Sequence, residues 1–238
     1  MNIILLRPAD WIKDNIVRLT DERSQHIRNV LKSKAGDHLK VGLIGGNRGL
    51  AVVLTSQNRD IHLQVSLNEP PPSRHDFDII LALPRPKILR RVLRTAAEFG
   101  VRHLYLIHSA RVEKSYWQSP LLEAEKINAA LCAGLERSGD TIAPVVQTYK
   151  RFKPFVEDVL PILMIDKPCW LADRNADQQI SVASGKPSIV MLGPEGGFIP
   201  YEINLARSVG CHPVNLGYRV LSVDTALATT LGQSLPNG

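Results

Sequence analysis

Short apolar runs alternate with turn residues over the first 70 or so residues of the chain. The runs are NIILL, HLKVGLI, LAVVLTS and IHLQVSL, which are typical of strands. The stretch GGNRG predicts a tight connection between two of them, and we expect Gly45, Gly46, Asn47 and Gly49 to supply the positive φ angles that it needs. A small β-barrel is the natural closure of these strands.

One helix is predicted within this otherwise β unit, over residues 21–37. The segment DERSQHIRNVLKSKAGD begins with acidic and serine residues that suit a helix N-terminus. It then places Ile27, Val30 and Leu31 at helical spacing and ends at Gly36. We expect a helix between the first strands.

A proline-rich segment, EPPPSRHD at residues 69–76, separates this unit from the rest of the chain. Consecutive prolines remove backbone donors and fix φ, so we place the domain boundary after residue 72. Beyond it the pattern alternates between strand and helix. The strands are expected at 77–83, 103–109, 159–166 and 188–193, and the helices at 88–100, 119–139, 202–210 and 223–235.

The predicted strands of this second part are apolar throughout, as in IILAL and IVMLG. Such strands are typical of a parallel sheet covered by helices on both faces, so the predicted fold class is α/β. With 238 residues and 44% apolar content, the chain is long enough to bury a substantial core.

The composition of the chain indicates which partners and which cellular location to expect. The net charge is +6 and the pI is about 9.3, which favours a polyanionic partner without distinguishing RNA, DNA and a membrane surface. Membrane-spanning length, a secretion signal and metal-ligand spacing are absent from the sequence. Cys132, Cys169 and Cys211 are widely spaced and read as reduced thiols, so we expect a cytoplasmic protein without a metal.

Basic residues are concentrated between Pro84 and Lys114. In this region Arg85, Lys87, Arg90, Arg91, Arg94, Arg102, Arg111 and Lys114 stand against only Glu98 and Glu113. Contact with phosphates is the functional interpretation, because affinity for nucleic acids comes mainly from such side chains. The alternative is a solvated helix face.

A glycine-rich loop follows the apolar run at residues 188–192. In SIVMLGPEGGF, glycines bracket Pro194 and Glu195, and a helix is expected to begin near Pro200. Glycine lets backbone amides approach a ligand closely, and ligands bind at the carboxyl ends of parallel strands. Neither GxGxxG nor GxxxxGK[ST] is present, which disfavours dinucleotide and nucleoside triphosphate sites. The alternative is a turn without a ligand.

These residues carry a family resemblance that spans nearly the whole chain. LGPEGGF at 192–198 and NLGYRVLSVDTALA at 215–228 resemble the second and third motifs of the RsmE family. That family consists of SPOUT-class enzymes that methylate N3 of a uridine in small-subunit (16S) ribosomal RNA. Further upstream, HIRNVLKSKAGD, LALPRP, AAEFGV and LERSGD resemble other family segments in the same order.

The resemblance implies a two-domain homodimer. Residues 1–72 would form a PUA-like β-barrel that binds RNA, and residues 73–238 a SPOUT methyltransferase domain with a C-terminal trefoil knot. The knot would hold S-adenosylmethionine, and the active site would lie at the dimer interface. By motif match, the cofactor-binding residues would be Leu192, Gly193, Pro194, Glu195, Gly196, Gly197, Leu216, Gly217, Tyr218, Arg219, Val220 and Leu221.

The chain departs from the family pattern at several charged positions. Ser222 stands where an arginine is usual and Asp224 where a glutamate is usual. Arg137 and Asp140 replace the glutamine and arginine of a helix segment, and Lys32 replaces an arginine. Charge type survives at Asp224 and Lys32, is lost at Ser222 and is altered at Arg137 and Asp140. These changes bear mainly on how the substrate is positioned.

The implied chemistry requires an acceptor nitrogen that has lost its proton. The uracil N3 is a poor nucleophile until a base removes that proton or a cation stabilises the resulting anion. Arg219 is the candidate cation, and Asp224 the candidate for orienting that arginine or relaying the proton. The alternatives are that Arg219 only binds phosphate and that Asp224 only caps a helix beginning at Thr225.

The target uridine must be unpaired or flipped out, because N3 lies on the Watson–Crick edge. Candidate RNA-binding residues are His26, Arg28, Lys32 and Lys34 on the first helix, and Arg85, Lys87, Arg90 and Arg91 in the basic region. A packed imidazole is the alternative for His26. The expected partner is ribosomal RNA, within the small ribosomal subunit.

Two other functions remain open at this point. One is an RNA-binding protein of the same fold that lacks catalysis. The other is a SPOUT methyltransferase that acts on another RNA or on a ribose hydroxyl.

Overall fold

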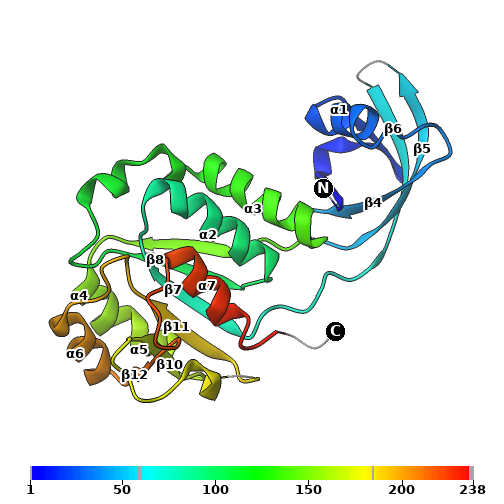
Figure 1. The fold of residues 1–238 in the computed structure, drawn as a ribbon. Coiled ribbons are helices and arrows are strands. Elements are labelled where there is room, and N and C mark those ends of the chain that lie inside the picture. The colour runs from blue at the N-terminus through cyan, green and yellow to red at the C-terminus, as the bar shows by residue number, and fades with distance from the viewer. Residues whose placement is uncertain (1, 58–59, 184, 236–238) are drawn as a thin grey trace. The chain divides into compact units, whose positions relative to one another are not determined.

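The computed structural model describes residues 2–57, 60–183 and 185–235, which fall into two compact units (Figure 1). The first comprises residues 1–72 and 132–143, and the second residues 73–131 and 144–238. Each unit has its own six-stranded sheet.

The N-terminal unit is a small β domain, as the apolar runs predict. Its sheet has the order β1-β4-β5-β6-β3-β2, in which β1 pairs parallel with β4 and the other neighbours are antiparallel. Alternate residues of the strands fill a core that includes Leu6, Val41 and Leu63. The strands are β1 (Ile4–Leu6), β2 (Trp11–Lys13), β3 (Ile16–Leu19), β4 (His38–Leu43), β5 (Arg48–Gln57) and β6 (Asp60–Glu69).

The turn between β4 and β5 needs only one positive φ angle. Gly45 has φ +79°, whereas Gly46, Asn47 and Gly49 do not lie in the left-handed region, so the prediction is wrong for these three. Gly49 is required for a different reason. A Cβ there would lie 2.0 Å from the carbonyl oxygen of Ser66, so β5 and β6 can approach only because this residue has no side chain.

The inserted helix is shorter than predicted. Helix α1 (Glu22–Asn29) begins after Asp21, whose side chain accepts a hydrogen bond from the Arg23 N–H. It ends at Asn29 and not at Gly36, because only Ile27 of the expected apolar residues has a core to enter. Val30 and Leu31 are 64% and 41% exposed, and Lys32 has a left-handed φ of +53°.

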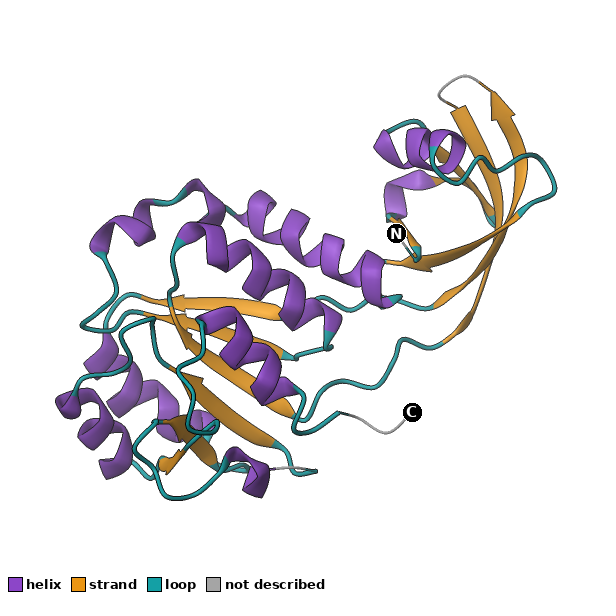
Figure 2. Ribbon diagram, in the orientation of Figure 1, coloured by secondary structure: helices purple, strands orange, loops and turns teal. Residues whose placement is uncertain are grey.

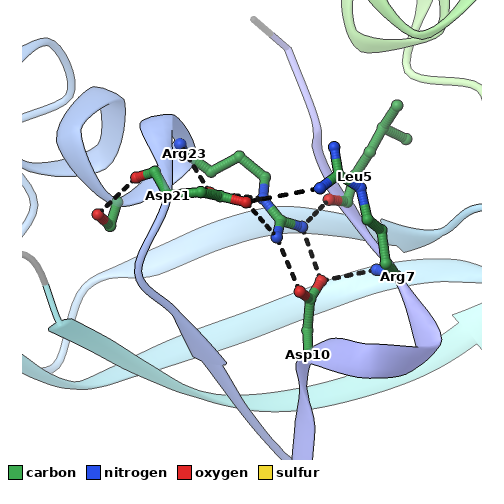
Figure 3. Close-up of polar contacts among 6 residues, drawn as sticks. Leu5, Arg7, Asp10, Asp21 and Arg23 are labelled. Carbon is green, nitrogen blue, oxygen red and sulfur yellow. Dashed lines mark hydrogen bonds and ion pairs between the residues drawn. The ribbon is translucent and has the colours of Figure 1, made fainter. Parts of the chain in front are cut away.

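A buried arginine joins α1 to the start of the chain (Figure 3). The Arg23 guanidinium donates to both oxygens of Asp10 at 2.7 Å, to Asp21, and to the Leu5 carbonyl at 2.7 Å. Its side chain is only 8% exposed. Burial alone would lower the Arg23 pKa, but the hydrogen bonds that Arg23 donates to Asp10 and Asp21 outweigh burial and raise the pKa. The Arg23 guanidinium is therefore held in its charged form and paired with both carboxylates.

Residues 132–143 pack within the N-terminal unit. The Asn2 N–H donates to the Glu136 carbonyl, the Gly45 N–H donates to the Thr141 carbonyl, and the Thr141 hydroxyl donates to the Gly46 carbonyl. Asp140 is buried, and its carboxylate accepts from the N–H groups of Thr141 and Ile142. This departure from the family pattern thus has a structural role in a turn.

The C-terminal unit confirms the predicted parallel α/β fold. Its sheet has the order β12-β10-β11-β7-β8-β9, and every neighbouring pair is parallel. The central strands β7 and β11 are buried along their whole length. The strands are β7 (Phe77–Ala82), β8 (His103–Ile107), β9 (Val145–Tyr149), β10 (Cys169–Ala172), β11 (Ser188–Leu192) and β12 (His212–Val214).

Two helices of this unit, α2 and α7, pack against each other beside the sheet (Figure 2). Helix α6 follows β11, as predicted, and packs against α4. The helices that lie wholly in this unit are α2 (Pro86–Glu98), α4 (Phe152–Pro154), α5 (Leu160–Leu163), α6 (Pro200–Ser208) and α7 (Val223–Leu231). Helix α3 (Ala124–Ser138) belongs to this unit only as far as Leu131. Short 3₁₀ turns lie at Pro8–Asp10, Lys114–Gln118, Pro120–Leu122 and Ile180–Ala183.

The strand predicted at residues 159–166 is wrong. A π-helical turn over Phe155–Val159 continues into α5, whose second residue is Pro161. The sheet is completed instead by β9, β10 and β12, which are short or half exposed and therefore leave no clear apolar run in the sequence.

Candidate active site

A cavity of about 490 Å³ opens beyond the carboxyl ends of β10 and β11. Most of its lining comes from the loop after β11, the loop after β10 and the segment between β12 and α7, and Arg111 after β8 joins them. This is where open parallel sheets bind ligands, and the volume lies within the range that holds a molecule the size of a nucleoside cofactor.

The two glycine-containing motifs meet in this cavity. It is lined by every residue of the predicted cofactor set except Tyr218, that is by Leu192, Gly193, Pro194, Glu195, Gly196, Gly197, Leu216, Gly217, Arg219, Val220 and Leu221. Tyr218 is 85% exposed and does not line the cavity. Its ring lies 5.3 Å from the guanidinium carbon of Arg219, so it contacts a lining residue from outside.

The glycines are required by the backbone of both walls. Gly197 and Gly217 have φ angles of +72° and +98°, which side chains rarely allow. The Gly197 N–H donates to the Pro194 carbonyl at 2.8 Å and closes the first turn. The Gly217 N–H donates to the Asn215 side-chain oxygen at 3.0 Å and fixes the second. Each turn is thus closed by a hydrogen bond within the protein itself.

Several lining residues were missed by the sequence reasoning. Arg111, in the segment after β8, donates to the Gly196 carbonyl and covers the glycine loop. Asp173 and Arg174 follow β10 directly and line the opposite side. Their signal is position alone, since residues after a parallel strand lie at the binding edge, and it was lost because β10 was not predicted.

The chemistry of the lining suits an adenosine-like ligand with a charged end. Leu192, Leu216, Val220 and Leu221 offer apolar side chains to the faces of a ring. The glycine turns add main-chain groups that no side chain covers. The cavity therefore fits S-adenosylmethionine by volume and by the chemistry of its lining.

A second, smaller cavity of about 210 Å³ lies beside the N-terminus of α7. Its lining residues form two ion pairs. Arg85 Nε lies 3.3 Å from Glu195 Oε1, and Asp224 Oδ2 lies 3.2 Å from Arg91. The lining residues are Arg85, Lys87, Ile88, Glu195, Ser222, Val223 and Asp224.

The structure separates the two candidate catalytic residues. Arg219 lines the larger cavity and Asp224 the smaller one, and Asp224 pairs with Arg91. Among the described residues, no hydrogen bond or ion pair joins Asp224 to Arg219. The expectation that Asp224 orients Arg219 therefore finds no geometric support.

Asp224 is not a helix cap either. Helix α7 begins at Val223 and its N-cap is Ser222, so Asp224 lies inside the first turn. The Ser222 hydroxyl donates to Asp224 Oδ1 at 2.6 Å, which is the main reason that the Asp224 pKa is lowered, and Arg91 adds to the effect. The serine at this departure position thus holds the carboxylate in its charged form.

The predicted RNA-binding residues fall into two groups. On the C-terminal unit, Lys87, Arg90 and Arg91 are exposed on α2, and the exposed Arg85 precedes it. On the N-terminal unit, His26 and Arg28 are half-buried on α1, whereas Lys32 and Lys34 are exposed beyond the end of this helix. The prediction that all four lie on the helix is wrong for the two lysines, because α1 ends early.

The described part of the chain holds no group of three or more histidine, cysteine or carboxylate side chains suited to a metal. In the same residues, no helix is long and apolar enough to cross a membrane.

Comparisons with known proteins identify the family. A model of the RNA methyltransferase domain matches residues 71–234, and a model of the RNA methyltransferase PUA domain matches residues 19–66. A ribosomal RNA small subunit methyltransferase E from Treponema pallidum is 27% identical over 243 residues, covering 100% of this chain and 91% of the relative. Its namesake from Synechocystis is 26% identical, covering 96% and 76%.

The fold agrees with solved structures. The crystal structure of a ribosomal RNA small subunit methyltransferase E from Neisseria gonorrhoeae bound to S-adenosyl methionine superposes with a TM-score of 0.75. The two proteins are 19% identical, and the match covers 98% of this chain and 95% of the other. Since the RNA methyltransferase model spans well over half of the sequence, the chain belongs to the RNA methyltransferase domain family.

Proposed function

We propose that this protein transfers a methyl group from S-adenosylmethionine to N3 of a uridine in 16S ribosomal RNA. The observation that carries the proposal is the meeting of two glycine-containing walls, residues 192–197 and 216–221, around one cavity. Support comes from relatives named ribosomal RNA small subunit methyltransferase E and from a similar fold described with bound S-adenosyl methionine.

The cofactor would be held mainly by the backbone. Main-chain groups of the turns at Gly197 and Gly217 would bind its polar edge, and Leu192, Leu216 and Leu221 would cover its ring. When bound, S-adenosylmethionine supplies a methyl group on an electrophilic sulfonium. The protein has to align an acceptor nitrogen with that group and exclude water.

Arg219 is the proposed cation of the larger cavity. Its guanidinium would stabilise negative charge on the acceptor or bind a nearby phosphate. For Asp224, whose oxygens are engaged by Ser222 and Arg91, the geometry favours a role in fixing those two side chains. Both assignments are part of the proposal.

RNA binding would use both units. We propose that residues 1–72 act as the RNA-binding domain and 73–238 as the methyltransferase domain. Exposed Lys32, Lys34, Lys87 and Arg90 would contact phosphates. We further propose a homodimer, a trefoil knot formed by the C-terminal segments, and a cytoplasmic protein that works on the small ribosomal subunit.

Two measurements test the proposal. Titration calorimetry with S-adenosylmethionine should give saturable binding, and its absence alongside intact RNA binding would favour a non-catalytic RNA-binding protein. Mass spectrometry of ribosomal RNA from a strain lacking the protein should then reveal one missing N3-methyluridine in 16S RNA. A missing methyl group on a ribose or on another RNA would contradict the substrate.

A further inference from the structure

Glu195 lies where the two cavities meet. Of the residues that line the larger cavity, only Glu195 and Val223 also line the smaller one. Val223 is apolar, so Glu195 is the single ionisable side chain common to both walls. A side chain that contacts both a cofactor in one cavity and an acceptor in the other has to lie where the two cavities meet.

From this placement we infer that the smaller cavity receives the target uracil ring and that the Glu195 carboxylate accepts its N3 proton. The inference rests on the proposed function, because it assumes that the larger cavity holds the methyl donor. It assigns the role of base to a residue that the motif comparison places only in the cofactor loop.

The smaller cavity has the size and lining for one flat ring. Its volume of about 210 Å³ is below the range that takes drug-sized ligands, which suits a single base extruded from the RNA. Ile88 and Val223 offer apolar contact to the ring faces. Arg85 also belongs to the lining, and in this proposal its cation would stabilise the negative charge that spreads from the deprotonated imide onto the ring carbonyl oxygens.

The hydrogen bonding of the two carboxylates separates their roles. Asp224 has both oxygens engaged, Oδ1 by the Ser222 hydroxyl and Oδ2 by Arg91. Glu195 has Oε1 engaged by Arg85, while Oε2 accepts no hydrogen bond from any of the residues that the structure describes. A proton acceptor needs a free lone pair, so Glu195 is the better placed of the two.

In the proposed step, the N3–H bond breaks, and its proton passes to Glu195 Oε2. The nitrogen electron pair forms a bond to the methyl carbon of S-adenosylmethionine, the carbon–sulfur bond breaks, and its electrons stay on sulfur. The products are N3-methyluridine, S-adenosylhomocysteine and a protonated Glu195, which then loses its proton to water.

The test compares Glu195→Gln with Glu113→Gln. Glu113 is an exposed carboxylate of the same unit that lines neither cavity, so the two variants undergo the same chemical change. With transcribed 16S RNA and saturating S-adenosylmethionine, E195Q should lower the single-turnover rate by about 100-fold or more, the size of a general-base contribution. E113Q should keep the wild-type rate, and calorimetry should show that both variants still bind S-adenosylmethionine, so that saturating cofactor restricts the comparison to the chemical step.

A second substrate tests proton removal itself. RNA transcribed with 5-fluorouridine carries a more acidic imide, which depends less on a base. E195Q should therefore recover much of its lost rate on this RNA, whereas a side chain that only positions the base would give no selective recovery. Equal losses on both RNAs would overturn the assignment of Glu195 as proton acceptor.

A third variant tests the cavity. Ile88 is half-buried, and Ile88→Trp should fill the ring site, weakening RNA turnover while leaving S-adenosylmethionine binding unchanged. Wild-type turnover by I88W or by E195Q overturns this inference alone. A wild-type protein that binds no S-adenosylmethionine or forms no N3-methyluridine overturns the proposed function, and this inference with it.

Discussion

The arginine–carboxylate pairs around Arg23 and those beside the smaller cavity have different surroundings. In the N-terminal unit, the side chains of Arg23 and Asp10 are 8% and 10% exposed, and every charged oxygen around the guanidinium is hydrogen-bonded. Beside the smaller cavity, the side chains of Arg85 and Arg91 are 64% and 59% exposed and each pairs with one carboxylate. The first arrangement holds a fold together, and the second leaves charge available to a ligand.

The largest loss of stability is expected from Arg23→Met. Removing one partner of a buried pair leaves Asp10 uncompensated, so the free energy of unfolding should fall by roughly 3–5 kcal/mol, measured by urea denaturation. Arg91→Met is the matched control at the exposed pair and should cost less than about 1 kcal/mol. Equal losses for the two variants would contradict the distinction.

The next largest effect is expected from Gly196→Val in the cofactor loop. A Cβ at this position would lie 2.9 Å from Arg111 Cδ, so the valine should displace Arg111 and intrude on the lining. We expect S-adenosylmethionine affinity to fall by about 100-fold, or about 2.7 kcal/mol, while the chain still folds. Unchanged affinity in calorimetry would show that the loop is not the cofactor site.

A smaller effect is expected for the exposed lysines and arginines. The double variant K87A/R90A should reduce the salt dependence of RNA binding, with the slope of log K against log salt falling by about 1.5, since each lost phosphate contact removes about 0.7–0.9. The double variant K32A/K34A makes the same comparison in the N-terminal unit. An unchanged slope would exclude that pair from contact with phosphates.

The smallest expected effect is the loss of unfolding free energy at low pH that comes from His75. His75 is fully buried, its Nε2 donates to the Leu231 carbonyl at 2.8 Å, and its Nδ1 accepts from the Phe77 N–H. Burial is the main cause that lowers its pKa below 6.5. The folded state thus favours the neutral ring, and its contribution to stability is complete above pH 6.5 and is lost as the pH falls below that value.

Measured unfolding free energies should accordingly be lower at pH 5.5 than at pH 7.5, and His75→Gln should flatten the difference. The N-terminal cluster should respond only at much lower pH. Hydrogen bonding to Arg23 is the main cause that lowers the Asp21 pKa below 3.8, so its contribution is retained above that value. An unfolding free energy that does not change between the two pH values would refute the role of His75.

The sequence predicts the cofactor cavity better than it predicts the base site, for a physical reason. Residues 192–197 and 216–221 are local motifs whose glycines mark their own backbone requirements. Arg111, Asp173 and Glu195 reach their places through strand order, which a single sequence does not specify. The motif predicts Glu195 only as part of the loop, because its position between the two cavities depends on where α2 and α7 pack.

The fold shows the same division. The sequence predicts strands with continuous apolar runs correctly, such as β7 and β11, but it does not predict the half-exposed β9 or the short β10 and β12. The apolar run at residues 159–166 predicts a strand, although a run of that length is equally compatible with a helix. The end of α1 was misplaced because Val30 and Leu31 follow helical spacing but have no core to contact.

The membership of residues 132–143 in the N-terminal unit has a consequence for synthesis on the ribosome. Thr141 bonds to the backbone of Gly45 and Gly46, so that turn cannot acquire its final partners when residue 72 leaves the exit tunnel. Domains generally fold as units during translation. Here the first unit cannot be completed until residues 132–143 have been synthesised, and these come after residues 73–131 of the second unit. The folding of the two units therefore overlaps in time.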